Sequence, residues 1–322
     1  MVRAARFQGK AGTVESFNAH ADDFQREGVR AVTIESAQDG TAQPRDRKVT
    51  LVPQSDETKQ ADTKMKPDHD TVYAQQAADY DRMIQYEDIE QEWRHSVQQV
   101  LNKQHYERII EIGAGTGRFT RVVLADMSNR DWQSGSYVAS DASEAMLEQL
   151  KHNISLDVSL GRISAPTAAK LSTHEALHHK LPLADHSADL ILAGWTICYG
   201  ACEGNTSEEL SSLLDRIMSE LRRILRPGGC IAIWETLGTG VAAPEVPPGL
   251  RTYIRDLEER YGFERTELST HFRFPSMEEA KQITSWFFGS AACEFLTLET
   301  DGSVVLPSYT GLWVWDNDKA RQ

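Results

Sequence analysis

The sequence predicts an α/β protein built around a parallel sheet with helices on both faces. Short apolar runs alternate with amphipathic stretches through the middle of the chain, and strands that alternate with helices form such sheets. A glycine-rich turn, GAGTG, directly follows the first apolar run, RIIEI. In open parallel sheets a turn of this kind lies at the carboxyl ends of the strands, where ligands bind.

The N-terminal region is predicted to lead into the core without forming a domain of its own. Residues 1–66 are polar and show no sustained apolar period, which is typical of a disordered tail. Residues 67–105 carry apolar side chains at mainly helical spacing. They therefore predict two or three helices that form an N-terminal helical cap.

The core is predicted over residues 106–240. Its strands are the apolar runs at 108–112, 136–140, 189–193 and 230–235. Leucines and isoleucines form a helical stripe over 208–225, so this segment is predicted to pack as a helix on the sheet. The RPGG that follows, at 226–229, is predicted to end the helix and turn the chain into the next strand.

Residues 241–322 are predicted to complete the sheet and to close over the acceptor site. After a Pro-rich connection we expect a helix at about 250–261, a strand at ELSTHFRF and a helix at 276–288. The last strands are expected near 294–298 and 311–315. In GLWVW both alternating faces are apolar, as in a strand that is buried on both sides.

Composition restricts the classes of partner. The 322-residue chain has 34 lysines and arginines against 48 aspartates and glutamates, a net charge of -14. Because this charge repels polyanions, nucleic acid and anionic membranes are disfavoured and a small molecule is favoured. Four cysteines are too few for a disulfide framework. With no apolar run of roughly 18 residues and no signal core, we expect a cytoplasmic protein.

The spacing in GAGTG distinguishes between classes of nucleotide ligand. Gly113, Gly115 and Gly117 free the turn of Cβ atoms, so that its backbone approaches a ligand closely. A dinucleotide fingerprint has its third glycine one residue later, and a P-loop continues with Lys and Ser or Thr. Here Arg118 and Phe119 follow. Phosphate binding is therefore the weaker interpretation.

Two carboxylates indicate a ligand with a ribose and a positive charge. Glu111 lies two residues before the first glycine, where it would repel a pyrophosphate but attract an ammonium group or order the loop amides. Asp141 closes the second apolar run, 24 residues after Gly117. An acid at that place accepts hydrogen bonds from both ribose hydroxyls.

These residues match the pattern of a known family. Over about residues 80–238 the chain resembles the class I S-adenosylmethionine-dependent methyltransferases, with EIGAGTG, SDASEAML, LPLADHSADLILA and LRPGGCIAIWETLG in the family's order. The resemblance implies a doubly wound, mostly parallel, seven-stranded sheet of Rossmann-like type and S-adenosylmethionine as the cofactor. The Asn-Pro-Pro-aromatic signature of nucleic-acid and glutamine amino methyltransferases is missing at the fourth strand, which disfavours an amide or an exocyclic amine as the acceptor.

The resemblance also implies cofactor contacts. Glu111 would order the loop and the methionine end, Asp141 would bind the ribose, and the region of Gly194 would lie near the transferring methyl. Packing against the cofactor is implied for Gly113, Ala114, Gly115, Thr116 and Gly117, and contact with the adenine for Ala142 and Met146. Tyr80 matches a position where such enzymes bring a tyrosine over the methionine end, where an aromatic face suits a cation. The alternative for Tyr80 is helix packing alone.

One position departs from the family pattern. In close relatives an acid two to four residues before the Leu-Pro pair holds the adenine amino group, whereas Glu175 lies six residues before Leu181. Either Glu175 reaches the adenine from a longer loop, or a backbone amide and His174 replace it.

The acceptor pocket is expected after the fourth strand, where Trp195, Cys198 and Tyr199 are the local candidates. Core packing is the alternative for Trp195. Methyl transfer is an in-line displacement that depends on proximity and alignment. A general base is required only if the attacking atom must lose a proton, and His271 and Glu235 are the candidates for it.

No metal site is predicted. Histidines cluster at 174, 178, 179 and 186, but no cysteine or paired acid completes a ligand spacing, so we interpret this segment as a solvated loop. The sequence thus predicts an enzyme that transfers a methyl group from S-adenosylmethionine to a small molecule. The alternative is a non-catalytic protein that binds the same cofactor as a regulator or partner subunit.

Overall fold

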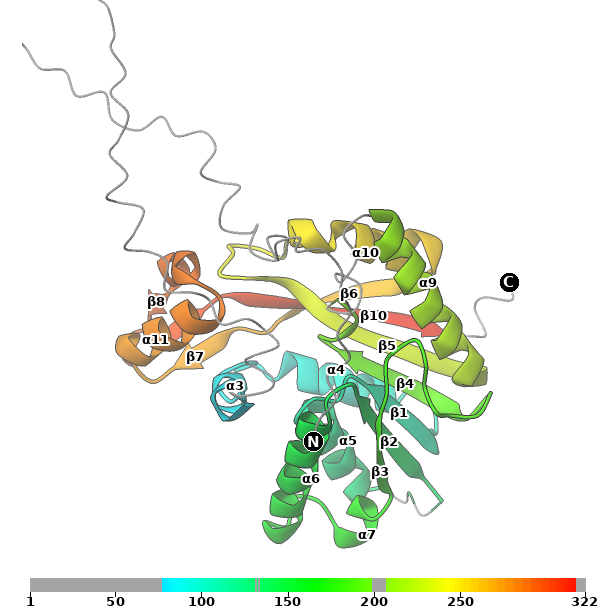
Figure 1. Ribbon diagram of the computed structural model, residues 1–322. Coiled ribbons are helices and arrows are strands. Elements are labelled where there is room, and N and C mark those ends of the chain that lie inside the picture. The colour runs from blue at the N-terminus through cyan, green and yellow to red at the C-terminus, as the bar shows by residue number, and fades with distance from the viewer. Residues whose placement is uncertain (1–76, 131, 133, 199–206, 317–322) are drawn as a thin grey trace, which may run out of the picture.

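The computed structural model describes residues 77–130, 132, 134–198 and 207–316 (Figure 1). The predicted tail at 1–66 lies outside these residues. At the centre is a seven-stranded sheet with the strand order β3-β2-β1-β4-β5-β10-β6. The predicted doubly wound α/β fold, with its mostly parallel seven-stranded sheet, is confirmed.

Five neighbouring strands of this sheet are parallel. In spatial order they are β3 (Leu171–Glu175), β2 (Ser136–Asp141), β1 (Arg108–Ile112), β4 (Ala188–Gly194) and β5 (Leu225–Thr239). The order along the chain reverses between β1 and β4, so a crevice is expected at the carboxyl ends of these two strands. Beyond β5, β10 (Ser308–Asp316) runs antiparallel to both β5 and β6 (Glu264–Ser269). The GAGTG turn follows β1 and therefore lies at the point of reversal.

Helices cover both faces of the sheet, as Figure 1 shows. One face carries α4 (Glu92–Leu101), α5 (Arg118–Ser128), α6 (Glu144–Ser159) and the short α7 (Ala165–Ala168). The other carries α9 (Ser207–Ile224) and α10 (Arg251–Arg255), with the 3₁₀ segment η3 (Pro248–Leu250) before α10 and the π-helical segment η4 (Asp256–Arg260) after it. α6 begins where Ser143 accepts a hydrogen bond from the Met146 amide, the ordinary N-cap of a helix.

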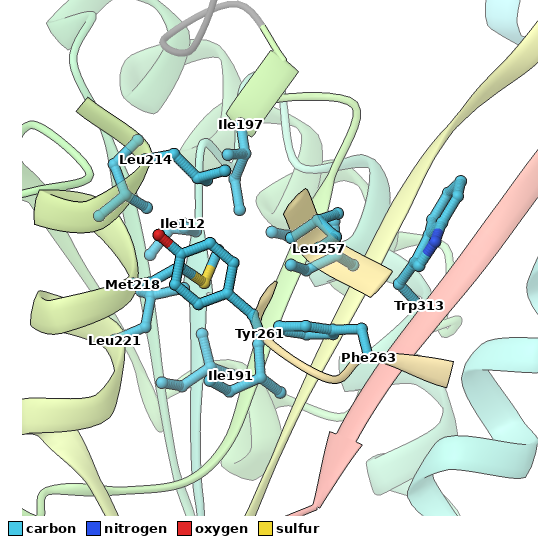
Figure 2. Packing of buried hydrophobic residues seen from close by; sticks show 14 of the residues in the cluster. Ile112, Ile191, Ile197, Leu214, Met218, Leu221, Leu257, Tyr261, Phe263 and Trp313 are labelled. Atoms are coloured by element: carbon cyan, nitrogen blue, oxygen red, sulfur yellow. The ribbon is translucent and has the colours of Figure 1, made fainter. Parts of the chain in front are cut away.

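Strand β10 is buried on both sides, as the GLWVW pattern predicted. Leu312 and Val314 pack into the core beneath α4 to α6, and Trp313 and Trp315 pack into the core beneath α9 and α10. Figure 2 shows part of the core beneath α9 and α10, where Leu257 and Phe263 lie between α9 and Trp313. The alternation of a strand thus divides one run of apolar residues between two cores.

The predicted turn RPGG lies within β5 in the structure. Ala188 of β4 pairs with Leu225, and the next paired residue of β4, Leu190, faces Cys230, so the register shifts across this segment. Proline has no amide hydrogen for the ladder, and Gly228 has a φ of 76°. The prediction of a turn is therefore corrected to an irregularity inside a strand that begins directly after α9.

The predicted strand ELSTHFRF is divided between two sheets. β6 ends at Ser269, and Phe272–Phe274 forms β7 of a three-stranded sheet with the order β7-β9-β8. The other strands are β9 (Val304–Leu306) and β8 (Thr297–Leu298). A 3₁₀ segment, η5 (Ser290–Phe295), occupies the start of the strand that the sequence predicted at 294–298, so only Thr297–Leu298 of that prediction forms a strand.

The small sheet and two helices share a core of their own, which we call the cap (residues 77–91 and 272–306). Its helices are α3 (Ala77–Ile84) and α11 (Met277–Phe287), and its buried residues include Met83, Phe274 and Val304. The Arg273 amide donates to the Tyr86 carbonyl at 2.8 Å. The segments 77–91 and 272–306, which are distant in the sequence, thus meet in one apolar cluster beside the main sheet (Figure 1). No helix among the described residues is long and apolar enough to cross a membrane.

The replacement Trp313→Ala is expected to lower the free energy of unfolding by about 3–5 kcal/mol, because it leaves a large cavity. Trp313 is fully buried, and its Nε1 donates to Glu258 at 2.9 Å. Urea denaturation of the purified variant measures the change. The control is Leu298→Ala in β8, where the side chain is 63% exposed and a change within about 0.5 kcal/mol is expected. Equal changes in both variants would contradict this account of the core.

Candidate cofactor and acceptor site

The glycine turn has the backbone that its sequence requires. Gly113, Gly115 and Gly117 have φ values of 62°, 54° and 93°, in the left-handed region that favours glycine. A Cβ atom at Gly113 would lie 1.8 Å from Thr196 Oγ1, and one at Gly117 would lie 2.9 Å from the Leu150 side chain. A Cβ atom at Gly115 would meet no described atom within 4 Å. Two of the glycines therefore allow close packing, and the third leaves one side of the turn open.

Asp141 holds the open part of the turn. Its Oδ2 accepts a hydrogen bond from the Gly115 amide at 2.8 Å, and its Oδ1 accepts one from the Ser143 amide at 2.9 Å. Burial raises the pKa of this carboxyl, although these amides favour its ionised form. The side chain therefore connects the end of β2 with both the glycine turn and the start of α6. Of the two residues expected at the adenine, Ala142 is exposed beside Asp141 and Met146 is buried in the first turn of α6.

Glu111 lies behind the turn and is buried, with 2% of its surface exposed. Its Oε2 accepts hydrogen bonds from Tyr137 Oη at 2.6 Å and from the Thr120 hydroxyl. Burial raises the pKa of Glu111 to about 7. The carboxyl thus joins β1 and β2 to the first part of α5, the helix that begins at the turn.

The remaining positions of the turn are also held by neighbours. The Ala114 amide donates to the Ser140 carbonyl at 3.0 Å, and Asn153 Nδ2 donates to the Thr116 carbonyl at 3.0 Å. Both Ala114 and Thr116 are buried. The turn is therefore fixed by β2 on one side and by α6 on the other.

Glu175 is the last residue of β3 and lies opposite Asp141 in the parallel register. It is exposed, and the amide of the next residue, Ala176, donates to the Asp141 carbonyl at 2.9 Å. The preceding residue, His174, lies opposite Ser140. The structure thus brings Glu175 to the edge of the sheet that carries Asp141, one strand further out.

The end of β4 is shaped by aromatic packing. Gly194 has no side chain, and a Cβ atom there would lie 2.0 Å from the ring of Phe119. The next residue, Trp195, has a φ of 49°, which is uncommon for a residue other than glycine. Its amide donates to the Trp234 carbonyl at 2.7 Å. β5 therefore holds the chain in this turn just after the last residue of β4.

Two further hydrogen bonds hold the segment after Trp195. Thr196 Oγ1 lies 3.0 Å from His178 Nε2, and the Cys198 amide donates to Glu235 Oε1 at 3.1 Å. Burial lowers the pKa of His178 to about 4, so the imidazole is neutral. His178 is half-buried, and the interpretation of its segment as a solvated loop is corrected at this residue.

Arg118, the first residue of α5, links this segment to the cap. Its guanidinium carbon lies 3.8 Å from the centre of the Trp195 ring and 4.7 Å from that of Trp93. It also forms an ion pair with Glu87 of the cap, and the two side chains are 14% and 8% exposed. The Arg118 guanidinium, beside the glycine turn, therefore makes both cation–π contacts and an ion pair.

Two residues singled out by the sequence lie elsewhere, and a third is not described. Tyr80 is half-buried in the cap, 5.8 Å from Phe287 between ring centres. His271 lies between β6 and β7, where its Nδ1 is 3.1 Å from the Ser308 amide that donates to it. Tyr199 lies outside the described residues. Within the described residues, no group of three or more His, Cys, Asp and Glu is arranged to hold a metal ion.

Comparison with known proteins agrees with this geometry. Residues 110–233, from β1 into β5, match the family model described as a methyltransferase domain. These residues of the chain are a methyltransferase domain. The predicted family is thereby confirmed, and with it S-adenosylmethionine as the cofactor of that family.

Individual proteins are similar to the chain over different lengths. The malonyl-acyl-carrier-protein O-methyltransferase of Methylococcus capsulatus is 31% identical over 136 residues, which are 42% of this chain and 39% of the relative. A solved S-adenosylmethionine-dependent methyltransferase from Aquifex aeolicus is 16% identical with a TM-score of 0.39, covering 69% of this chain and 91% of that one. The YcgJ protein of Bacillus subtilis is 15% identical with a TM-score of 0.40, covering 69% and 97%.

Alanine substitutions at Gly113 and Gly115 distinguish the energetic cost of lost packing from the cost of backbone strain. Alanine at either position costs roughly 1–2 kcal/mol because of the left-handed backbone, but only Gly113→Ala also collides with Thr196. Gly113→Ala is therefore expected to lose more stability to urea than Gly115→Ala. Gly115→Ala is expected to weaken cofactor binding, because its methyl group occupies the open side of the turn. Equal stability losses would contradict the packing role of Gly113.

The buried pair of Arg118 and Glu87 is expected to show a coupling energy of about 0.5–3 kcal/mol in a double-mutant cycle of unfolding. Each of Arg118→Met and Glu87→Gln leaves the other charge buried alone, so the double variant costs less than the sum. The exposed pair of Lys151 and Glu148, 2.7 Å apart on α6, is the matched control and is expected to give at most about 0.5 kcal/mol. A coupling no larger than that of the control pair would be evidence against a linking role for Arg118.

Proposed function

We propose that this protein transfers a methyl group from S-adenosylmethionine to a small-molecule acceptor. The proposal rests on Gly115, which has open space on its Cβ side and whose amide donates to Asp141. Both residues lie at the point where the strand order reverses. A turn free of side chains beside a carboxylate fits a nucleoside whose ribose hydroxyls donate to that carboxylate. When bound, S-adenosylmethionine supplies the methyl group and leaves as the neutral sulfide.

The residues around the turn have roles in this proposal that follow from their positions. Asp141 binds the ribose, and Ala142, Met146 and Glu175 lie beside it for the adenine. Thr116 and the three glycines form the surface on which the cofactor packs. Glu111 holds the turn from behind through Thr120 and Tyr137, and its carboxyl adds negative potential where the methionine end is positive.

The acceptor is proposed to bind beside Gly194 and Trp195. This segment is held by hydrogen bonds to Trp234, His178 and Glu235, so it offers a preorganised wall for alignment of the attacking atom. Tyr199 follows it in the sequence and remains a proposed contact. The net charge of -14 supports a small acceptor over a nucleic acid. The similar protein from Methylococcus capsulatus is named for O-methylation, which supports oxygen as one class of attacking atom.

Calorimetry is expected to show that S-adenosylmethionine and its demethylated product bind with dissociation constants on the order of micromolar. Asp141→Ala is expected to make the binding free energy of both ligands less favourable by about 1–3 kcal/mol, because charge-assisted hydrogen bonds to the ribose are lost. Asp141→Asn, which retains an oxygen acceptor, is expected to lose less. If the affinity of Asp141→Ala were unchanged, the ribose would have to bind to another residue.

Binding without methyl transfer would support the alternative of a non-catalytic regulator, which the family assignment does not favour. Incubation with methyl-labelled cofactor and a fractionated metabolite extract tests this point, because a labelled small molecule names both the acceptor and the methylated atom. No heat with either ligand, on protein shown to be folded by circular dichroism, would overturn the proposed function.

A further inference from the structure

Glu235 is a buried carboxyl at the same edge of the sheet as the proposed cofactor site. It follows Trp234, which lies opposite Gly194, the last residue of β4. Its side chain has no exposed surface and contacts the segment after β4 through the Cys198 amide. Cys198 is two residues beyond Thr196, whose hydroxyl packs on Gly113. Glu235 therefore contacts the same short segment, 196–198, that packs on the glycine turn.

The two oxygens of Glu235 differ in their bonding. Oε1 accepts hydrogen bonds from the Cys198 amide at 3.1 Å and from Tyr253 Oη at 3.2 Å. Oε2 is also buried, and no described residue donates to it or accepts from it. The neighbour in β10 is Gly311, which brings no polar side chain. Among the buried carboxylates that the structure describes, Glu235 is the one with an unpartnered oxygen.

An unpartnered oxygen is unfavourable in either protonation state. As a carboxylate, Oε2 lacks a donor, and as a carboxylic acid its hydroxyl lacks an acceptor. Burial raises the pKa of Glu235 to about 7, although hydrogen bonds from Cys198 and Tyr253 lower it. Holding the Cys198 amide needs only a neutral acceptor such as an amide oxygen. The ionisable group therefore calls for a further partner, and a ligand with a donor group would satisfy it.

We propose that Glu235 is the catalytic base and that its Oε2 receives an N–H or O–H group of the methyl acceptor. The acceptor is then an amine, alcohol or phenol whose attacking atom carries a proton. This inference rests on the proposed function.

The proposed step balances within the residues and reactants named. A lone pair on the acceptor nitrogen or oxygen forms a bond to the methyl carbon, and the carbon–sulfur bond breaks with its electron pair on sulfur. The proton of the attacking atom moves to Oε2, which leaves Glu235 neutral until water takes the proton. The titratable groups that face the carboxyl are the Cys198 thiol, on the segment after β4, and the Tyr253 phenol of α10.

The test is Glu235→Gln, which keeps an oxygen for the Cys198 amide and the size of the side chain but accepts no proton. The control is Glu278→Gln, an exposed position on α11. Release of the demethylated cofactor is measured with primary alkylamines, alcohols and phenols. Acetate and malonate, which carry no proton on the attacking oxygen, are measured alongside.

We expect wild-type protein to methylate at least one amine, alcohol or phenol. Glu235→Gln is expected to lower kcat for it by about 10²-fold or more, the ordinary range for a lost general base, with a smaller change in KM. Glu278→Gln is expected to stay within about twofold of wild type. In wild type, kcat/KM should rise with pH through an apparent pKa of about 7, because only the carboxylate accepts a proton. The variant should lack this inflection.

Cofactor calorimetry separates this inference from the proposed function. Glu235→Gln is expected to bind S-adenosylmethionine as wild type does, because Glu235 contacts the acceptor and not the cofactor. Equal rates in wild type and Glu235→Gln with every acceptor, including no turnover by either, would overturn the assignment of Glu235 and leave the cofactor site untouched. Transfer to acetate or malonate only would overturn it as well. A wild-type protein that binds no cofactor would overturn both proposals.

Discussion

The backbone of Gly113 packs directly against the side chain of Thr196, and the geometry of the whole site depends on this close approach. Gly113 begins the turn after β1, and Thr196 lies just beyond β4, the strand on the other side of the point where the strand order reverses. A Cβ atom between them would force the turn and the segment apart. With glycine there, the two segments that would hold the cofactor and the acceptor lie in contact.

The segment after β4 is restrained by several independent neighbours. The Trp234 carbonyl holds the Trp195 amide, and Arg118 covers the Trp195 ring. His178 and Glu235 hold the next residues. A left-handed tryptophan is costly by itself, so its presence here means that the surrounding contacts determine the backbone. Such restraint suits a reaction whose rate depends on the alignment of two reacting atoms.

Three carboxyls lie at this edge of the sheet, and their bonding differs. Glu111 and Asp141 have hydrogen-bond donors from the chain, and these donors join strands to the glycine turn. Glu235 has donors at one oxygen only. The first two therefore support the shape of the turn, and the third retains the capacity to bind a further group.

The sequence by itself determined the fold class and the class of cofactor. Apolar periodicity depends on local backbone geometry, so the strands and helices of the core were readable from the chain. The glycine spacing with Glu111 and Asp141 indicated a ligand with a ribose and a positive charge, and the resemblance of four motifs to a known family identified this ligand as S-adenosylmethionine. The limits of ELSTHFRF and RPGG were predicted wrongly, because the division between two sheets and the irregularity in β5 depend on neighbouring strands. Only the tertiary structure decided that His178 bonds Thr196, that Arg118 pairs with Glu87, and that one oxygen of Glu235 is without a partner. Each of these facts depends on packing between elements that are distant in the sequence, and no local pattern encodes such a contact.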